Sequence, residues 1–307
     1  MRRNRSRALP RVLRSTRVRA AFPTVVMPSP LAMFDRLRPP LYGRRPPLVL
    51  LNGLAEQYES WYRNRKFWGR YFEVLTPNIL VYEGESLHQR IRRREPVTVD
   101  YLVQQLHTYL DQFVQTPPYH LVSSSLGGKV AIEFAVRYPE LVSRVVLLCP
   151  SGMGDTEQLP IIEGMTGRDP NAMVKSVFYK PRHVDRNVLR YYKTRFSNRR
   201  WKTGFVKTVR GTLDYTVREK MKDLKCPTLL VSGKEDKVCD PATAEEAAGE
   251  LPNGVFLSIP KCGHAPQIEK AWKINRLVVH FLSAADPTSL PSFTQLLLAK
   301  PPRPRAS

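Results

Sequence analysis

The chain has 307 residues, of which 42% are hydrophobic and 27 are prolines, so it can bury a sizeable core in one large domain, with or without an insertion. This composition excludes a disordered chain, a collagen, a coiled coil and a small disulfide scaffold. No apolar run approaches the ~18 residues of a bilayer-spanning helix, so we do not expect an integral membrane protein. The formal net charge of +22 lies mostly in two segments, residues 1–45 (+11) and 153–222 (+9).

The N-terminal segment, residues 1–45, is strongly basic: its first twenty residues hold eight arginines and no acid. Because like charges repel and little apolar area is available, we expect a disordered extension. Such a segment is also typical of phosphate or anionic-lipid contact and of an organellar transit sequence. Alternatively, translation begins later, at Met27 or Met33.

Short apolar runs alternate with amphipathic helical patterns through residues 46–152 and again through 223–283. Apolar runs of this length are typical of buried parallel strands, and Thr98 is the expected N-cap of one helix. Strands that alternate with helices need crossover connections, so we predict an α/β fold with a mostly parallel, twisted sheet and helices on both faces. The predicted strands are 48–52, 79–83, 119–123, 144–149, 228–233 and 254–260, and the predicted helices are 98–113, 126–139, 241–250 and 268–282.

The alternation stops between the two halves. Residues 153–222 have helical periodicity, eight aromatic residues and a net charge of +9, which predicts a helical insertion. Aromatic residues at helical spacing are more often packed core than a ligand pocket. At the other end, residues 284–307 are rich in proline and are expected to form an irregular tail.

The cysteines favour an intracellular protein. They form no Cys-x-x-Cys pair and have no metal-ligand spacing with histidine, so we expect free thiols in a reducing compartment, with no metal. We therefore expect a cytoplasmic protein, with organellar import left open by the arginine-rich N-terminus. The four are Cys149, Cys226, Cys239 and Cys262.

A serine follows the predicted strand at 119–123 in the sequence HLVSSSLGG. A strand that runs through small residues into a helix is the setting of a nucleophilic serine, because the tight turn exposes the hydroxyl and the helix start directs N–H groups at an oxyanion. The usual pattern is Gly-x-Ser-x-Gly. Here Ser123 replaces the first glycine, Ser125 is the predicted nucleophile and Gly127 is the last position; a nucleophilic Ser124 would place Leu126 where a small residue is needed.

A carboxylate and a histidine follow two later strands. Asp236 lies on the loop after the strand at 228–233 and is favoured over Glu235 and Asp240 by its Gly-x-x-Asp spacing. His264 follows a glycine on the loop after the strand at 254–260. A carboxylate and an imidazole at the carboxyl edge of a sheet can activate a serine.

The order Ser125, Asp236, His264 is that of the α/β-hydrolase fold. Residues 46–283 resemble serine-nucleophile α/β-hydrolases with a helical cap inserted after the family's sixth strand, and 153–222 falls where that cap belongs. The resemblance assigns the oxyanion-hole N–H groups to Leu54 and Leu126. The segment that supplies the first donor usually begins His-Gly; here it begins with Asn52.

The resemblance implies a serine hydrolase that cleaves a carboxylic ester or related acyl bond through an acyl-enzyme, with no cofactor and a small, hydrophobic or amphiphilic acyl substrate. Alternatives on the same fold are a carbon–carbon bond hydrolase, a thioesterase and a perhydrolase. A non-catalytic binding protein is a weaker alternative, because no member of the triad is missing. The basic charge suggests nucleic acid, but no nucleic-acid-binding motif accompanies it, so we expect no specific recognition.

Overall fold

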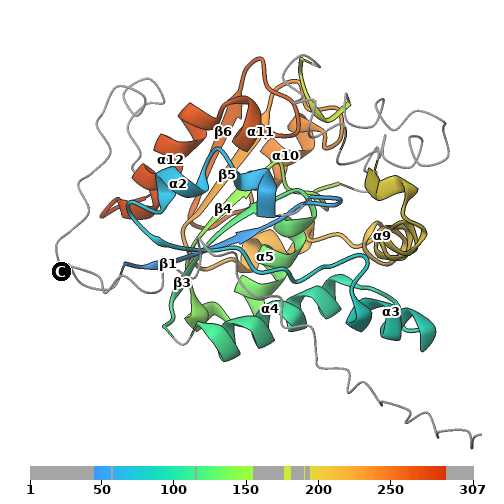
Figure 1. The fold of residues 1–307 in the computed structure, drawn as a ribbon. Coiled ribbons are helices and arrows are strands. Elements are labelled where there is room, and N and C mark those ends of the chain that lie inside the picture. The colour runs from blue at the N-terminus through green and yellow to red at the C-terminus, as the bar shows by residue number, and fades with distance from the viewer. Residues whose placement is uncertain are drawn as a thin grey trace, which may run out of the picture. The chain divides into compact units, whose positions relative to one another are not determined.

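A computed structural model of the chain describes residues 45–56, 58–114, 116–154, 176–180, 190 and 194–287. These residues form a six-stranded, all-parallel sheet with the strand order β2-β1-β3-β4-β5-β6 (Figure 1), which confirms the predicted fold class. The strands are β1 (Pro47–Leu51), β2 (Glu73–Leu75), β3 (Tyr119–Ser124), β4 (Val142–Leu148), β5 (Thr228–Gly233) and β6 (Gly254–Ile259).

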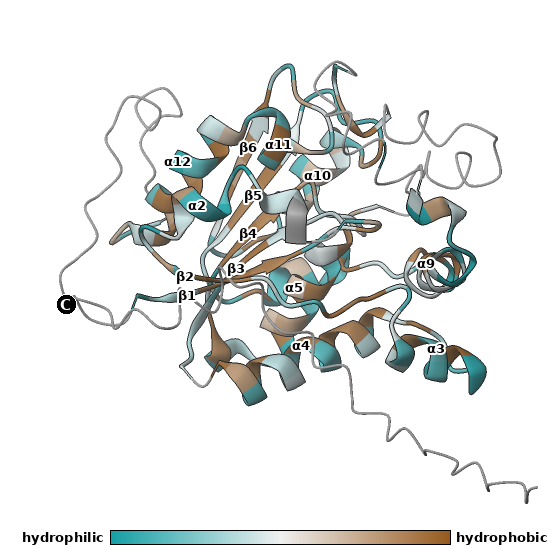
Figure 2. Cartoon of the chain, in the orientation of Figure 1, coloured by the Kyte–Doolittle hydropathy of each residue, from teal (hydrophilic) through white to brown (hydrophobic). Residues whose placement is uncertain are grey.

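Helices cover both faces of the sheet, because alternate strand residues point to opposite sides. Val49 and Leu51 of β1 pack in one buried cluster with α4 (Val99–Phe113), α5 (Leu126–Arg137) and α10 (Pro241–Ala248). Leu48 and Leu50 pack in a second cluster with α2 (Arg65–Trp68) and α12 (Ala271–Ser283). Figure 2 shows the resulting hydrophobic strands between helices with hydrophilic outer sides. The shorter helices are η1 (Tyr58–Trp61), α3 (Glu85–Arg92), η2 (Pro139–Leu141) and α11 (Pro266–Glu269).

The predicted strand at 79–83 is wrong. The strand beside β1 is β2, Glu73–Leu75, and residues 79–81 are irregular. The apolar side chains of 79–83 pack against helices instead: the half-buried Leu80 packs against the first cluster, and the buried Tyr82 ring lies 4.9 Å from the Trp201 ring. The apolar run at 79–83 therefore indicates contact with the hydrophobic core, but it does not pair in the sheet.

The ends of the helices follow the local sequence. The Thr98 hydroxyl accepts a hydrogen bond from the Tyr101 N–H (3.2 Å), which confirms the predicted N-cap of α4. The helix predicted at 268–282 is two helices, α11 and α12, which meet at Lys270.

The described part of residues 153–222 consists of helices and irregular segments. It contains α9 (Arg199–Thr212), which begins at the N-cap Asn198, and η4 (Arg218–Asp223). Trp201 and Phe205 of α9 are fully buried and pack with Ala55, which follows β1, and Ala265, which follows β6. These aromatic residues are therefore core between α9 and the loops at the carboxyl ends of the strands.

A buried lysine joins α5 to the end of α9. Lys129 is 1% exposed, and its Nζ donates hydrogen bonds to the carbonyl oxygens of Thr212 (2.9 Å) and Leu213 (3.1 Å). Carbonyl groups at the end of a helix attract a cation, so the ammonium group is stabilised where it lies.

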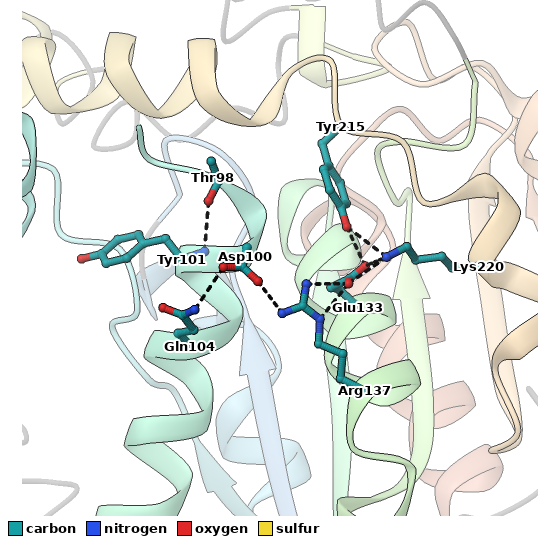
Figure 3. A network of polar contacts seen from close by, with 8 residues as sticks. All are labelled: Thr98, Asp100, Tyr101, Gln104, Glu133, Arg137, Tyr215 and Lys220. Atoms are coloured by element: carbon teal, nitrogen blue, oxygen red, sulfur yellow. Dashed lines mark hydrogen bonds and ion pairs between the residues drawn. The ribbon is translucent and has the colours of Figure 1, made fainter. Parts of the chain in front are cut away.

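A network of charged side chains joins the same helix to its neighbours (Figure 3). Glu133 of α5 is buried and accepts hydrogen bonds from Arg137 (2.8 Å), Lys220 (2.8 Å) and the Tyr215 hydroxyl (2.7 Å). Arg137 also pairs with Asp100 of α4. Burial raises the pKa of the Glu133 carboxyl, but these donors outweigh burial and hold the pKa below its ordinary value.

The predicted extension and tail lie outside the described residues, apart from Arg45 and residues 284–287, and so do Met27 and Met33. Within the part of the chain that the structure describes, no helix is both long enough and apolar enough to cross a membrane.

Candidate active site

Ser125 lies in the turn between β3 and α5, with φ 48° and ψ −119°. A positive φ is strained for a residue with a side chain and is found mainly where the surroundings enforce it. Here the Ser125 N–H donates to the backbone carbonyl oxygen of Leu148 (3.2 Å). The backbone carbonyl oxygen of Ser125 accepts from the N–H groups of Gly128 (2.8 Å) and Ser151 (3.2 Å). The strand–turn–helix predicted from the sequence is confirmed.

The residues on either side show why small side chains are needed. A Cβ atom at Gly127 would lie 2.4 Å from the Leu51 oxygen, so the start of α5 touches the backbone at the end of β1. Ser123 replaces the usual first glycine and is fully buried, and its hydroxyl donates to the Val146 oxygen of β4 (3.3 Å). The fold accommodates this departure by adding a hydrogen bond between strands.

Asp236 and His264 are in direct contact. The His264 Nδ1 lies 2.8 Å from the Asp236 Oδ2, and the two residues are 5% and 8% exposed, respectively. The second oxygen, Oδ1, accepts hydrogen bonds from the N–H groups of Val238 (2.8 Å) and Cys239 (3.2 Å). Both carboxylate oxygens are thus bonded, which fixes the orientation of the carboxylate toward the imidazole.

The contact changes the pKa of both groups. Burial raises the pKa of the Asp236 carboxyl, but the charge of His264 and three hydrogen bonds outweigh burial and hold it below its ordinary value. Burial lowers the pKa of the His264 imidazole, but Asp236 and the side chain of Cys239, each by charge and by a hydrogen bond, outweigh burial and hold it well above its ordinary value. The pair is therefore poised to accept a proton at the imidazole.

The two alternative carboxylates have other partners. Glu235 accepts the Cys262 N–H (2.9 Å), and Asp240 caps α10 by accepting the Thr243 N–H (3.0 Å). Glu235 therefore supports the loop that carries His264, and Asp240 serves a helix end.

Glu269 of α11, which the sequence analysis did not identify, also holds the histidine loop. It accepts the N–H groups of Gly263 (2.7 Å) and Tyr179 (3.0 Å). In addition, the His264 N–H donates to the Val177 oxygen (2.8 Å). Segment 177–179, in the predicted cap, is thus joined directly to the histidine loop.

The predicted oxyanion donors lie on two segments in contact. Gly53 and Ala55 use their N–H groups internally, in bonds to the Glu56 carboxylate and the Tyr82 hydroxyl (both 2.9 Å). Within the described residues, the N–H groups of Leu54 and Leu126 have no hydrogen-bond acceptor, as a donor kept for a substrate requires. Asn52, which replaces the family histidine, accepts the Trp61 indole N–H (2.6 Å).

The structure brings Ser125 to the oxyanion loop but does not bond it to the histidine. Within the described residues, no hydrogen bond joins Ser125 to His264. A Cβ atom at Gly53 would lie 3.0 Å from the Ser125 Cβ. Gln267, three residues after His264, donates to the hydroxyl of Ser124 (3.2 Å). The turn and the histidine loop are therefore neighbours, and hydrogen bonds at catalytic sites often tighten only when substrate binds.

Glu56 is a second residue that sequence reasoning missed. Its carboxyl accepts a hydrogen bond from the Gly53 N–H and interacts with the Ser124 hydroxyl, and the positive charge of His264 stabilises its ionised form. Burial raises its pKa, and these three interactions oppose the rise. Glu56 also lines a cavity of about 20 Å³, which has room for one water molecule, together with Leu126. Its segment, Leu-Ala-Glu-Gln, matches no motif, so only the fold could reveal it.

A thiol completes the surroundings of the histidine. One ligand atom each from Cys149, Asp236 and His264 lie within 4.8 Å of one another, close enough to hold a cation. Burial raises the pKa of the Cys149 thiol well above its ordinary value, and the hydrogen bond between Asp236 and His264 already occupies the other two groups. The donor set therefore fits a protonated thiol beside a carboxylate–imidazole pair better than a metal centre.

Similar proteins have a common fold and related chemistry. The chain is 24% identical over 267 residues to Monoacylglycerol lipase ABHD6 of Homo sapiens, covering 80% of this chain and 78% of that protein. It is 25% identical to Lipase 1 of Psychrobacter immobilis, covering 73% and 72%.

Among solved structures, a serine hydrolase from Cycloclasticus zankles superimposes with a TM-score of 0.68 at 21% identity, covering 78% of this chain and 90% of that one. A meta-cleavage product hydrolase from Pseudomonas fluorescens does so with a TM-score of 0.66 at 22% identity, covering 80% and 93%. Residues 48–273 match the sequence model of the Alpha/beta hydrolase family. The chain therefore belongs to the alpha/beta hydrolase family of enzymes.

Proposed function

We propose that this protein is a serine hydrolase that cleaves a carboxylic ester through Ser125, His264 and Asp236. The observation that carries the proposal is the buried contact of 2.8 Å between Asp236 and His264. Gln267, three residues after His264, joins this loop to Ser124, the neighbour of a serine held at φ 48° in a strand–turn–helix. A buried imidazole oriented by a carboxylate, on a loop next to the turn that carries a serine, is what general-base activation of a hydroxyl requires.

In the first half of the reaction, Ser125 Oγ attacks the ester carbonyl carbon while His264 takes the hydroxyl proton. Asp236 keeps the proton of His264 on Nδ1, so that Nε2 is the base, and it stabilises the imidazolium that forms. The N–H groups of Leu54 and Leu126 bind the oxyanion, each contributing about 3 kcal/mol. His264 then gives its proton to the departing alcohol, and an acyl-enzyme remains.

In the second half, His264 removes a proton from a water molecule, which attacks the acyl carbonyl. The same two N–H groups bind the second oxyanion. Collapse of this intermediate breaks the bond to Ser125, which regains its proton from His264, and the carboxylic acid leaves. The cycle uses side-chain and backbone groups alone.

The proposed substrate class is based on the similar proteins. Two of the similar proteins are named for lipase activity on acylglycerols or lipids, which favours an ester with a hydrophobic acyl chain. We place residues 153–222 over the site as the cap, since α9 packs against the loops that follow β1 and β6. A thioester, a carbon–carbon bond beside a ketone and perhydrolysis use the same triad and are distinguished by the substrate panel below.

The test combines labelling and turnover. A fluorophosphonate probe is expected to modify Ser125, which peptide mapping identifies, and Ser125→Ala is expected to lose both labelling and hydrolysis of p-nitrophenyl esters of increasing chain length. Ser258→Ala, an exposed serine on β6, is the matched control and should behave as wild type. Labelling of Ser124, or undiminished turnover by Ser125→Ala, would contradict the assignment.

A further inference from the structure

The oxyanion loop, residues 52–56, is closed by one side chain. The Glu56 carboxylate accepts the Gly53 N–H through Oε2 (2.9 Å), and the Glu56 N–H donates to the Gly53 carbonyl oxygen (3.3 Å). The Ala55 N–H donates to the Tyr82 hydroxyl (2.9 Å). Leu54, the predicted oxyanion donor, therefore lies between two residues whose N–H groups are both bonded, and the direction of its own N–H depends on them.

Gly53 faces both the Glu56 carboxyl and the candidate nucleophile. A Cβ atom at Gly53 would be 3.0 Å from the Ser125 Cβ and 3.1 Å from the Glu56 carboxyl carbon. The serine and the carboxyl therefore meet beside the backbone that precedes Leu54. An oxyanion donor must lie within about 2.7–3.1 Å of the oxygen that it stabilises, so a small movement of Gly53 would weaken the donor that follows it.

Ser124 connects Glu56 to the histidine loop. Its hydroxyl interacts with the Glu56 carboxyl, whose ionised form it stabilises, and accepts a hydrogen bond from the Gln267 side chain (3.2 Å). Ser124 and Gln267 are both fully buried. Polar contacts are stronger in a buried site than at the surface, because the effective dielectric constant is lower. Glu56 is thus connected to the neighbour of Ser125 and to the helix that follows His264.

A gap beside the oxyanion loop makes these contacts important. Glu56 lines the cavity of about 20 Å³ together with Asn52 and Gly53 of the loop and with Leu126. Packing is therefore incomplete beside both segments that carry oxyanion donors, and atoms next to a gap lack the contacts that would hold them on that side. The hydrogen bonds of Glu56 hold the loop at this point instead.

We propose that Glu56 is a positioning residue of the oxyanion hole: its carboxylate holds Gly53 beside Ser125 and thereby directs the Leu54 N–H at the reacting carbonyl oxygen. The inference rests on the proposed function, in which Leu54 supplies one of the two oxyanion donors. Glu56 touches no reacting atom in this role and acts through the backbone of Gly53. It differs from Asp236, which acts on the base.

Such a residue acts on the transition state more than on the bound ester, because the negative charge on the carbonyl oxygen develops only as the carbon is attacked. Its loss should therefore lower kcat and leave KM nearly unchanged. Removal of an oxyanion donor costs about 10²- to 10³-fold in kcat, so misdirecting one donor through Glu56 should cost about 10- to 100-fold.

The test compares Glu56→Met with Glu56→Gln, using a soluble p-nitrophenyl ester. Both variants keep the length of the side chain and remove its charge, so both should move the pH–rate profile of kcat/KM to lower pH by the same amount. Only glutamine keeps an oxygen that can accept the Gly53 N–H. On the high-pH plateau, Glu56→Met should lose about 10- to 100-fold in kcat with KM within about twofold of wild type, and Glu56→Gln should stay within about threefold of the wild-type kcat.

A trifluoromethyl ketone gives a second readout, since its adduct with a serine places an oxyanion in the hole. Its affinity should fall in Glu56→Met by the same factor as kcat/KM, whereas the corresponding methyl ketone, which stays unreacted, should bind all variants equally. Glu56→Ala should show the same losses, so the test does not depend on one substitution. Glu73→Met, at an exposed carboxylate on β2, is the matched control and should behave as wild type. Circular dichroism and urea denaturation check that each variant is folded.

Three results would overturn the proposal: a wild-type kcat in Glu56→Met on the plateau, an equal loss in Glu56→Gln, and a fall in kcat/KM that comes entirely from KM. Ser125→Ala separates this step from the proposed function. If Ser125→Ala loses all turnover and Glu56→Met loses none, only the role of Glu56 is wrong. If Ser125→Ala keeps full turnover, the proposed function fails, and the role of Leu54 as a donor fails with it.

Discussion

The two halves of the candidate site are held in different ways. On the histidine side, side-chain carboxylates do the positioning: Asp236 bonds His264, while Glu235 and Glu269 hold the backbone just before it. On the serine side, backbone contacts do the positioning: Ser125 is kept at a positive φ by bonds to neighbouring main-chain groups.

The difference reflects the task of each half. The imidazole must gain and lose a proton, so it needs a charged partner whose field changes its pKa. The hydroxyl needs a fixed direction, and a strained turn between a strand and a helix supplies it. Substitutions on the histidine side should therefore alter rates and pH dependence, whereas substitutions behind the serine should chiefly alter stability.

The largest effect is expected for Asp236→Asn. An amide at this position favours the wrong tautomer of His264 and removes the charge that stabilises the imidazolium, so kcat should fall by about 10³- to 10⁴-fold. Steady-state kinetics with a p-nitrophenyl ester measures the change, with circular dichroism to check folding. Asp240→Asn, on the same loop, is the matched control and should keep nearly full activity. A loss below tenfold in Asp236→Asn would show that the pair is not the base.

Next in size is Lys129→Met, behind the serine. Methionine keeps the length of the side chain but leaves the carbonyl groups of Thr212 and Leu213 without their donor, so the free energy of unfolding should fall by about 3 kcal/mol. Urea denaturation measures the fall. Lys207→Met, an exposed lysine on α9, should change stability by less than about 0.5 kcal/mol. Equal stabilities would mean that the buried ammonium does not join the two helices.

A smaller loss of stability is expected for Ser123→Ala. The substitution removes the hydrogen bond to the Val146 oxygen without adding volume, so the free energy of unfolding should fall by about 1 kcal/mol. Activity should remain, because Ser123 does not contact the reacting groups. A large fall in kcat with unchanged stability would instead place this hydroxyl in the reaction.

The smallest effect, a shift in pH dependence, is expected for Glu56→Gln. His264 must be neutral to take the serine proton, so kcat/KM rises with pH through its pKa, which Asp236 holds well above the ordinary value of 6.5. An ionised Glu56 favours the imidazolium further. Glutamine removes that charge, lowers the pKa of His264 and should move the rise to lower pH. A pH–rate profile checks this, and a shift to higher pH would contradict it.

The sequence predicted the fold and the loops that carry the candidate site residues, because each signal was local. The strands at 228–233 and 254–260, the turn at Ser125 and the loops bearing Asp236 and His264 all follow from apolar runs and the residues that end them. The strand beside β1 was not predicted, because Glu73–Leu75 has only three residues, one of them charged. The strand predicted at 79–83 instead is apolar for another reason, its contact with α9.

The residues that the sequence could not reveal depend on distant contacts. From the sequence, Lys129 resembles an ordinary surface lysine of α5; only the fold shows that it bonds the end of α9. From the sequence, Glu56 resembles an ordinary loop carboxylate; only the fold shows its interaction with Ser124. Whether a charged side chain is buried depends on residues that are distant in the sequence, so the hydrophobic periodicity of its own helix or loop does not predict it.

The close approach at Gly127 limits how this enzyme could be redesigned. Because the first turn of α5 rests against the Leu51 carbonyl, the segments that carry Leu54 and Leu126 are packed directly against each other. Insertions or bulkier residues there would disturb both at once. Libraries aimed at new substrates should therefore leave 52–54 and 125–128 untouched.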